Sequence, residues 1–244
     1  LIVHVDIDPD ETGRRYPNTL AVIGDARRTL DAIFSVVSSI VPKQDSRRME
    51  MEEYRAGRFG DSVTVEPQGS LVRAIREATP EDVIVIEGNT QIGYVSGVHF
   101  PVYVPRTYLT SSYFGNLGFA YPTALGAKVA QPNRTVVAIS GDGGFLYNSQ
   151  ELATAVQHGI NVIAIIFNDD AFGNVLRDQK NMFDGHVIGS ELHNPDFVKL
   201  AEAYGARGVR AVDDRALALA LKDAQELDVP TVIEVPVGEM PYAW

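Results

Sequence analysis

Residues 135–144 read Thr-Val-Val-Ala-Ile-Ser-Gly-Asp-Gly-Gly, a continuous apolar run that leads into a glycine-rich turn with one carboxylate. A run without polar alternation is expected of a strand that is buried on both faces of a sheet. A helical pattern follows the turn, so the segment predicts a strand, a loop and a helix in that order. In that context, the backbone N–H groups of the loop and of the helix start suit a phosphate group.

Working outward, three further apolar runs have the same character, at residues 83–86, 162–167 and 231–235. Helical patterns alternate with them, at residues 122–130, 149–158, 197–204 and 215–226. This alternation predicts an α/β fold with a doubly wound, mostly parallel sheet and helices on both faces. Gly159 and Gly205 stand where two helices are expected to end, and Asn148 with Glu151 has the spacing of a capping box.

Asp142 places a negative charge in a loop that suits phosphate. Two like charges 4 Å apart repel by about 4 kcal/mol at an effective dielectric constant of about 20, and a cation removes this conflict. Mg²⁺ commonly binds through one or two carboxylates together with phosphate oxygens, and oxygen ligands favour Mg²⁺ or Ca²⁺ over zinc. Asn168 ends the next predicted strand, and neighbouring strands lie about 5 Å apart. The sequence therefore predicts an Mg²⁺–diphosphate site shared by Asp142 and Asn168.

The composition excludes several classes of function. The chain has 244 residues, 21 Lys and Arg against 32 Asp and Glu, and a net charge of −11, which disfavours nucleic acid and anionic membrane surfaces as partners. The absence of cysteine excludes disulfides, iron–sulfur clusters, thiolate zinc sites and a cysteine nucleophile. No apolar run approaches the roughly 18–20 residues of a membrane span. We expect a cytoplasmic protein with neither a nucleic acid nor a membrane partner.

The chain divides into three parts by pattern. Residues 1–42 predict two short strands and one helix that Asp25 caps, with an apolar stripe from Leu30 to Val41 that we expect to pack in a core. Two strands and one helix do not close a core alone, so we expect residues 1–42 to end a preceding central domain. An arm packed on the main domain is the alternative.

Residues 43–69 are expected to form a linker with a short helix, and residues 70–244 are expected to form the diphosphate- and Mg²⁺-binding domain. The chain starts without Met or a signal-peptide pattern, so we expect a segment before it.

The segment from Gly141-Asp-Gly-Gly-Phe to Asn168-Asp-Asp resembles the thiamine diphosphate signature, which runs from a Gly-Asp-Gly triplet to a pair of asparagines. Residues 112–122 resemble the glycine-rich, pyrimidine-binding stretch of that family. Residues 4–9, 24–26 and 235–241 resemble parts of acetolactate synthase and its relatives. Two positions depart from the signature: Asp169 stands where Asn is usual, and Gly144 stands where Ser is frequent.

The resemblance implies which residues bind the cofactor and its cation. The metal ligands would be the side chains of Asp142 and Asn168 and the main-chain carbonyl of Asp170. Gly143 and Gly144 would donate N–H groups to the diphosphate, and Leu117 would wedge the cofactor into its bent form. The full set of cofactor-binding residues implied by the resemblance is Gly88, Asn89, Thr90, Gly115, Leu117, Gly141, Asp142, Gly143, Gly144, Asn168, Asp170, Phe172 and Gly173.

The resemblance also implies an activity: decarboxylation or carboligation of small 2-oxo acids, with the cofactor supplying the carbanion chemistry. The family's glutamate that bonds the pyrimidine comes from a pyrimidine-binding domain of the same or a neighbouring subunit, and no segment here matches that domain. We therefore expect no catalytic residue in this chain, no activity of the chain alone, and a homodimer or homotetramer as the working enzyme.

Two further groups of residues carry expectations. Asn174, Val175 and Asp178 follow the metal-binding loop and are expected to approach the substrate. Five aromatic residues around the pyrimidine stretch are expected to form an apolar interface patch. They are Tyr108, Tyr113, Phe114, Phe119 and Tyr121.

Two other functions remain open at this stage. Gly141-x-Gly143 after a strand is also found in NAD-binding Rossmann-type oxidoreductases. Against this reading, Leu146 occupies the third glycine position, and Asp142 would face bare pyrophosphate. The other alternative is a non-catalytic module that keeps the fold without the site, and the presence of both Asp142 and Asn168 disfavours it.

Overall fold

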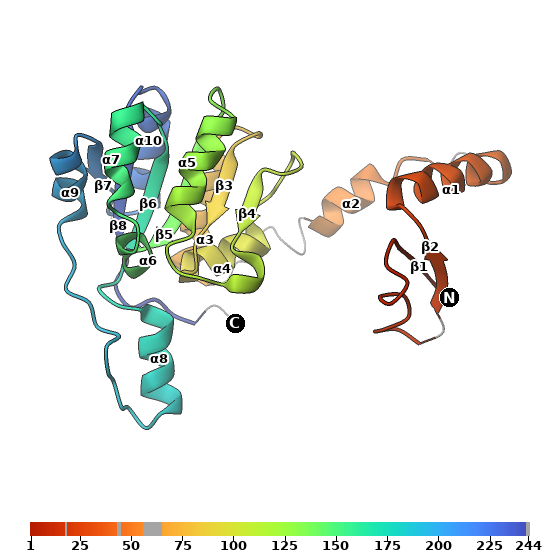
Figure 1. Ribbon diagram of the computed structural model, residues 1–244, viewed down its shortest axis with the longest axis horizontal. Coiled ribbons are helices and arrows are strands. Elements are labelled where there is room, and N and C mark those ends of the chain that lie inside the picture. Colours follow the sequence, from red (N-terminus) through yellow and green to blue (C-terminus); the bar gives the residue numbers. More distant parts are fainter. Residues whose placement is uncertain (18, 43–44, 56–64, 243–244) are drawn as a thin grey trace. The chain divides into compact units, whose positions relative to one another are not determined.

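The computed structural model describes residues 1–17, 19–42, 45–55 and 65–242, which belong to two units, Leu1–Ala56 and Gly57–Trp244 (Figure 1). The described part of the second unit contains a six-stranded sheet in the order β4-β3-β5-β6-β8-β7, and all neighbouring pairs are parallel. Its strands are β3 (Ile84–Glu87), β4 (Tyr108–Thr110), β5 (Val136–Gly141), β6 (Ile163–Asn168), β7 (Arg207–Arg210) and β8 (Thr231–Pro236).

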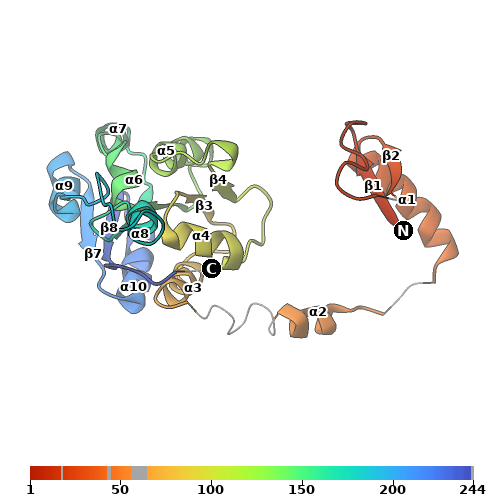
Figure 2. The same ribbon diagram turned by 90° about the horizontal axis from the view of Figure 1, so that it is seen from below.

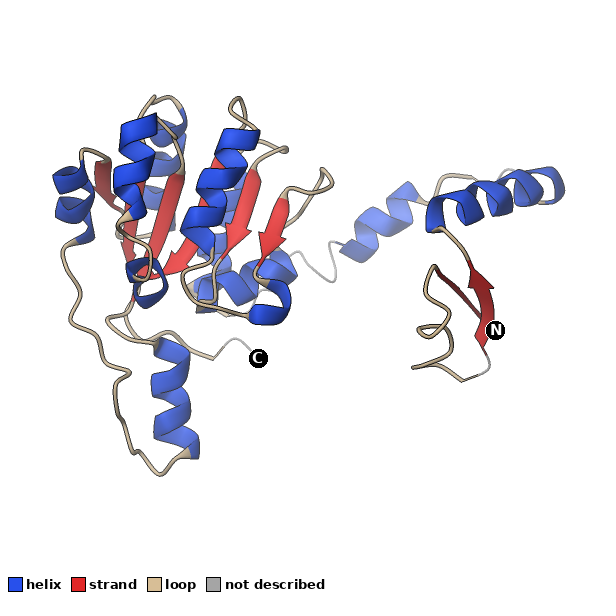
Figure 3. Cartoon of the chain, viewed as in Figure 1, coloured by secondary structure: helices blue, strands red, loops and turns tan. Residues whose placement is uncertain are grey.

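Helices cover both faces of this sheet (Figures 2 and 3). One face carries α3 (Gln68–Glu77), α4 (Gln91–His99) and α10 (Asp214–Gln225). The other face carries α5 (Ala120–Ala130), α7 (Glu151–His158) and α9 (Phe197–Tyr204). Three short or peripheral elements complete the unit: η2 (Ser112–Phe114), α6 (Asp142–Leu146) and α8 (Gly173–Met182), the last of which projects beyond the sheet in Figure 1. The doubly wound parallel α/β fold predicted from the sequence is confirmed.

The two-sided cover explains the continuous apolar runs. Along β5, Val137 and Ile139 pack in the cluster that contains α3, α4 and α10, whereas Val136 and Ala138 pack in the cluster on the opposite face. Because successive side chains of a strand point to opposite faces, both sets must be apolar when both faces are covered.

Phe197 offers a direct test of the packing on the second face. Its side chain is 0% exposed, and its ring meets Phe145 edge to face with 6.1 Å between the ring centres. We expect Phe197→Ala to lower the free energy of unfolding by about 3–5 kcal/mol, because the change removes buried apolar contacts and leaves a cavity. Urea unfolding measures the change. The same substitution at Leu219, which is 57% exposed on α10, should alter it by less than about 0.5 kcal/mol. Equal losses at both positions would contradict this description of the core.

The helix ends follow the predicted pattern at two positions and depart from it at a third. Gly159 and Gly205 end α7 and α9 with left-handed φ values of 61° and 87°. The predicted capping box is wrong, because α7 begins at Glu151 after Gln150 and no cap bond from Asn148 supports it. The Asn148 side chain instead donates to the Gly118 carbonyl oxygen at 2.8 Å, which ties the loop before α5 to the segment after α6.

The first unit contains parallel strands β1 (Ile2–Asp6) and β2 (Thr19–Ile23), and helices α1 (Ala26–Ile40) and α2 (Arg48–Arg55). The Asp25 side chain caps α1 as expected, by accepting from the Arg28 N–H. In the described residues the apolar stripe of α1 is uncovered, with no buried residue, so its packing in a core stays a prediction. The partition into residues 1–42, 43–69 and 70–244 stays a prediction, and residues 43–44 and 56–64 of the predicted linker lie outside the described residues.

Within the described ranges, no helix has both the length and the apolar character needed to cross a membrane.

Candidate functional site

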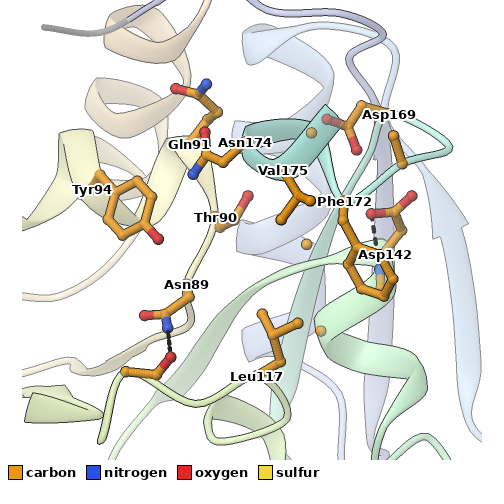
Figure 4. A pocket seen from close by; sticks show the side chains of 16 residues that line it. Asn89, Thr90, Gln91, Tyr94, Leu117, Asp142, Asp169, Phe172, Asn174 and Val175 are labelled. Atoms are coloured by element: carbon orange, nitrogen blue, oxygen red, sulfur yellow. Dashed lines mark hydrogen bonds between the residues drawn. The ribbon is translucent and has the colours of Figure 1, made fainter. Parts of the chain in front are cut away.

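The candidate site lies where three neighbouring strands end. β3, β5 and β6 are adjacent and parallel, and the register pairs Glu87 with Ile139 and Gly141 with Phe167. The loops that follow these strands therefore meet at one edge of the sheet. Together with residues 115–117 they enclose a pocket of about 240 Å³ (Figure 4). Its lining residues are Asn89, Thr90, Gln91, Tyr94, Gly115, Leu117, Gly141, Asp142, Gly143, Gly144, Asp169, Ala171, Phe172, Gly173, Asn174 and Val175.

Close packing leaves little room for side chains at the glycines after β5. A Cβ atom on Gly143 would lie 2.4 Å from Cε1 of Phe172 and 3.0 Å from Cδ1 of Leu192. A Cβ on Gly144 would lie 3.3 Å from the Ser140 hydroxyl oxygen. The sequence predicted a loop here, but Gly143 and Gly144 lie in the first turn of α6. Without side chains at these positions, the backbone of that turn forms part of the pocket wall and can approach a bound group closely. This arrangement suits a diphosphate next to the Gly143 and Gly144 backbone.

Asp142 and Asn168 point to a common centre. The Asn194 side-chain nitrogen lies 2.6 Å from Asp142 Oδ2, 2.9 Å from Asn168 Oδ1 and 3.2 Å from Asp170 Oδ1. An amide NH₂ group has two hydrogens, so it cannot satisfy three oxygens that belong to two carboxylates and one amide. Three converging oxygens of this kind suit a hard cation such as Mg²⁺.

The donor set of this centre needs the amide oxygen. Among the described residues, no group of three His, Cys, Asp or Glu side chains could hold a metal ion. The Asn168 amide oxygen completes the set formed by Asp142 and Asp170. A second sign of incomplete satisfaction is Asn194 Oδ1, which is buried and has no hydrogen-bond partner among the described residues. The residues present therefore fit a divalent cation at this point.

Asp170 has two kinds of oxygen near the cluster, and its role as a metal ligand stays a prediction. Its main-chain carbonyl, the expected metal ligand, accepts a hydrogen bond from Leu192 N–H at 2.8 Å, which leaves one lone pair. Its side-chain Oδ1 lies 3.2 Å from the same Asn194 nitrogen that meets Asp142 and Asn168. The residue has a left-handed φ of 54°, and its N–H donates to Asn168 Oδ1 at 3.1 Å. Asp170 thus belongs to the cluster through both its backbone and its side chain.

Two carboxyl groups at the site resist ionisation. Burial, and then the charge of Asp142, raise the pKa of Asp169 from 3.8 to about 7. Burial also raises the pKa of Asp142, against the opposing hydrogen bonds from Gly143 and Asn194. A divalent cation beside these groups would favour their charged forms. The electrostatics of the cluster therefore favour a bound cation.

The raised pKa of Asp169 predicts a pH dependence of stability without divalent cations. Between about pH 4 and pH 7 the unfolded chain loses this proton while the folded chain keeps it. The free energy of unfolding therefore falls as the pH rises through this window. Urea unfolding in EDTA should give a lower midpoint at pH 8 than at pH 5, and Asp169→Asn should reduce the difference. A wild-type midpoint that rises with pH, with no change in Asp169→Asn, would contradict this electrostatic description.

The opposite wall of the pocket comes from the loop after β3 and from residues 115–117. The Asn89 side-chain nitrogen donates to the Gly115 carbonyl oxygen, and Gly115 has a left-handed φ of 52°. In Figure 4, Asn89, Thr90 and Tyr94 lie across the pocket from Asp142 and Phe172, and Leu117 points into it from below. The pocket therefore has polar side chains on opposite sides, Asn89 and Thr90 on one and Asp142 on the other, and apolar lining from Leu117 and Phe172.

The structure places most of the expected residues together, with three exceptions. Gly88, Asn168 and Asp170 do not line the pocket. Gly88 fits instead against β5, where a Cβ would lie 2.7 Å from the Ile139 carbonyl oxygen, and the other two stand in the oxygen cluster. Asn174 and Val175, expected near the substrate, line the pocket, whereas Asp178 lines a separate groove along α8.

Sequence reasoning missed Gln91, Tyr94 and Asn194. Gln91 and Tyr94 lie at the start of α4, and they line the pocket because that helix begins directly after the loop. Asn194 lies 26 residues after Asn168, and no spacing in the sequence connects the two.

The expected aromatic patch is wrong as a group of five. Tyr121 is 3% exposed, and Tyr108 is half-buried, with its hydroxyl donating to Glu87 Oε2 at 2.9 Å. Phe119 packs against the core cluster beside α5. Only Tyr113 and Phe114 of the five are highly exposed, at 103% and 90%.

Comparisons with known proteins identify the family to which the chain is similar. Residues 88–235 match the family model described as thiamine pyrophosphate enzyme, C-terminal TPP binding domain. A probable acetolactate synthase large subunit of Methanocaldococcus jannaschii is 32% identical over 97% of this chain and 42% of its own length. A probable 2-ketoarginine decarboxylase of Pseudomonas aeruginosa is 34% identical over 84% of this chain and 37% of its own length.

A solved structure of a thiamine diphosphate-dependent enzyme is also similar to this chain. The thiamine diphosphate-dependent 4-hydroxybenzoylformate decarboxylase of Rhodococcus jostii superposes with a TM-score of 0.74 at 29% identity. The match covers 97% of this chain and 44% of that chain. The chain thus spans less than half the length of these relatives.

Proposed function

Since the chain belongs to the thiamine pyrophosphate enzyme family through its C-terminal TPP-binding domain, we propose that it binds thiamine diphosphate through Mg²⁺ as part of an acetolactate synthase-like enzyme acting on 2-oxo acids. The observation that carries this proposal is the convergence of oxygens from Asp142, Asn168 and Asp170 on one point beside a glycine-lined pocket.

Each wall of the pocket has a role in this proposal. Asp142 and Asn168 would hold the cation beside the diphosphate, and the backbone of Gly143 and Gly144 would face the phosphate groups. Leu117 would support the organic part of the cofactor, and Asn89 with Thr90 would bound the opposite side. When bound, thiamine diphosphate supplies the electron sink for decarboxylation of a 2-oxo acid.

The reaction class rests on the relatives. They include a probable acetolactate synthase and two decarboxylases, so the enzyme would decarboxylate a 2-oxo acid, join two such molecules, or do both. The chain spans 42% of the first relative's length, and we assign no catalytic acid or base within it. A pyrimidine-binding domain of the same or a neighbouring subunit would complete the site. The working enzyme would be a cytoplasmic homodimer or homotetramer, and the chain alone would be inactive.

Calorimetric titration with thiamine diphosphate tests the proposal. We expect the purified 244-residue chain to bind the cofactor in the presence of Mg²⁺ and to lose this binding in EDTA, because the diphosphate would otherwise face two carboxylates. Pyruvate should not be consumed by the chain alone.

The same preparation separates this function from the dinucleotide alternative. Two results together would contradict the proposal and favour an NAD site. They are an increase in NADH fluorescence on mixing and thiamine diphosphate binding that does not depend on Mg²⁺. Pyruvate turnover without a partner would contradict the assigned inactivity.

A further inference from the structure

The orientation of the Asn168 amide is fixed from both ends. Its nitrogen donates to Glu234 Oε1 at 3.0 Å. Its oxygen accepts from Asn194 Nδ2 at 2.9 Å and from the Asp170 N–H at 3.1 Å. As a result the oxygen, and not the nitrogen, faces the centre shared with Asp142.

Glu234 is itself held in place. It lies on β8, the neighbour of β6, and is only 4% exposed. Its other oxygen, Oε2, accepts from Arg210 Nε at 3.0 Å and from Arg210 Nη2 at 2.8 Å. Arg210 also pairs with Asp196 at 3.2 Å, and Asp196 caps α9 two residues after Asn194. The carboxylate therefore presents one fixed acceptor oxygen to Asn168.

We propose that Glu234 is a positioning residue that turns the Asn168 amide so that its oxygen faces the cation. This inference rests on the proposed Mg²⁺ site and adds a residue outside it, since Glu234 does not line the cofactor pocket. An ionised carboxylate only accepts hydrogen bonds, so its neighbour must offer the NH₂ side of the amide. The two ends of an amide have nearly the same size, so hydrogen-bond partners decide its orientation.

The isosteric change Glu234→Gln replaces a side chain that only accepts hydrogen bonds with one that can also donate them. A glutamine at position 234 would direct its oxygen to Arg210, which only donates, and its NH₂ group to Asn168. The new donor would draw the Asn168 oxygen toward position 234 and its NH₂ group toward Asp142, in competition with Asn194 and the Asp170 N–H, which hold the oxygen in the wild type. A nitrogen with two hydrogens cannot bind a cation, so the site would lose one ligand without losing packing volume.

The double variant Asn168→Asp with Glu234→Gln restores a hydrogen bond between the two positions, with residue 234 as the donor and residue 168 as the acceptor. The glutamine NH₂ would donate to one oxygen of the new carboxylate, and the other oxygen would face the centre. The formal charge of the pair is the same as in the wild type. This variant separates loss of orientation from general damage at position 234.

The test measures the Mg²⁺ concentration needed for half-maximal thiamine diphosphate binding by the full 244-residue chain. We expect Glu234→Gln to raise it about 10–100-fold, the usual effect of losing a residue that orients a metal ligand. The double variant should return to within a few-fold of the wild type. The matched control is Glu202→Gln, which removes one negative charge from an exposed position on α9 and should have no effect.

The outcomes are distinguishable. If the wild type shows no Mg²⁺-dependent binding, the proposed function fails and this inference fails with it. If the wild type binds and Glu234→Gln binds equally well, the positioning role is overturned while the proposed function stands. If Glu234→Gln loses binding or does not fold, recovery in the double variant supports the role. If the double variant still fails to bind thiamine diphosphate with Mg²⁺, the positioning role is overturned, and Glu234 serves only to stabilise the fold.

Discussion

Asp142→Ala should abolish Mg²⁺-dependent binding of thiamine diphosphate, with a loss of affinity of at least about 100-fold, above the range for residues that only orient a ligand. The substitution removes the carboxylate that stands both in the pocket wall and in the oxygen cluster. Asn168 and Asp170 would remain, but the cation would lose its ligand nearest to the pocket. Calorimetric titration of the cofactor at several Mg²⁺ concentrations measures the loss.

The fold should survive this change. Burial raises the pKa of Asp142, which means that the charged side chain is costly in the cation-free chain. Losing its bonds with Gly143 and Asn194 should therefore alter the free energy of unfolding by only about 1 kcal/mol. Asp31→Ala, at an exposed position of α1, is the matched control and should leave cofactor binding intact. Unchanged affinity in Asp142→Ala would instead favour a module that has the fold without the site.

Gly93→Ala should be the most damaging of the glycine substitutions near the site. Gly93 lies in α4, and a Cβ there would stand 2.2 Å from the Gly88 carbonyl oxygen and 3.1 Å from Cγ of Glu87. A backbone carbonyl cannot move aside without displacing the loop that carries Asn89 and Thr90. We expect the free energy of unfolding to fall by about 3 kcal/mol, at the upper end of the cost of overpacking. Cofactor affinity should fall as well, because that loop forms a wall of the pocket.

Gly126→Ala provides the matched control. Gly126 lies in α5, and a Cβ atom there would meet nothing within 4 Å. Alanine in an open helical position stabilises a helix by about 0.5–1 kcal/mol relative to glycine. The same substitution in two helices is thus expected to have opposite signs in urea unfolding. Equal and small effects at both positions would show that α4 does not pack against the loop as described.

The central strands were predictable because of their burial. β5 and β6 are apolar at nearly every position, since helices cover both faces. The edge strands β4 and β7 were missed because they are short and partly polar, as in Arg207–Arg210. Three α-helices of the described second unit were not predicted. The α4 helix contains two glycines and no polar face, and α8 has no buried residue to mark a stripe. The short α6 helix contains the glycines that had been assigned to a loop.

The part of the site that follows from the order of the strands could be predicted from the sequence. Because β5 and β6 are neighbours, the residues after them had to meet, and Asp142 and Asn168 do so. Asn194 and Glu234 were out of reach, as they lie 26 and 66 residues beyond Asn168 in sequence. Only the three-dimensional pairing of β6 with β8, and the loop that leads into α9, bring them to the cluster.

The most direct test of the central claim is a crystal structure of the chain grown with thiamine diphosphate and Mn²⁺ as the probe ion. Its anomalous difference map should show one strong peak within bonding distance of the Asp142 carboxylate, the Asn168 amide oxygen and two phosphate oxygens. A cofactor bound in this pocket with no peak between these two side chains, or a peak that only other residues coordinate, would contradict the account.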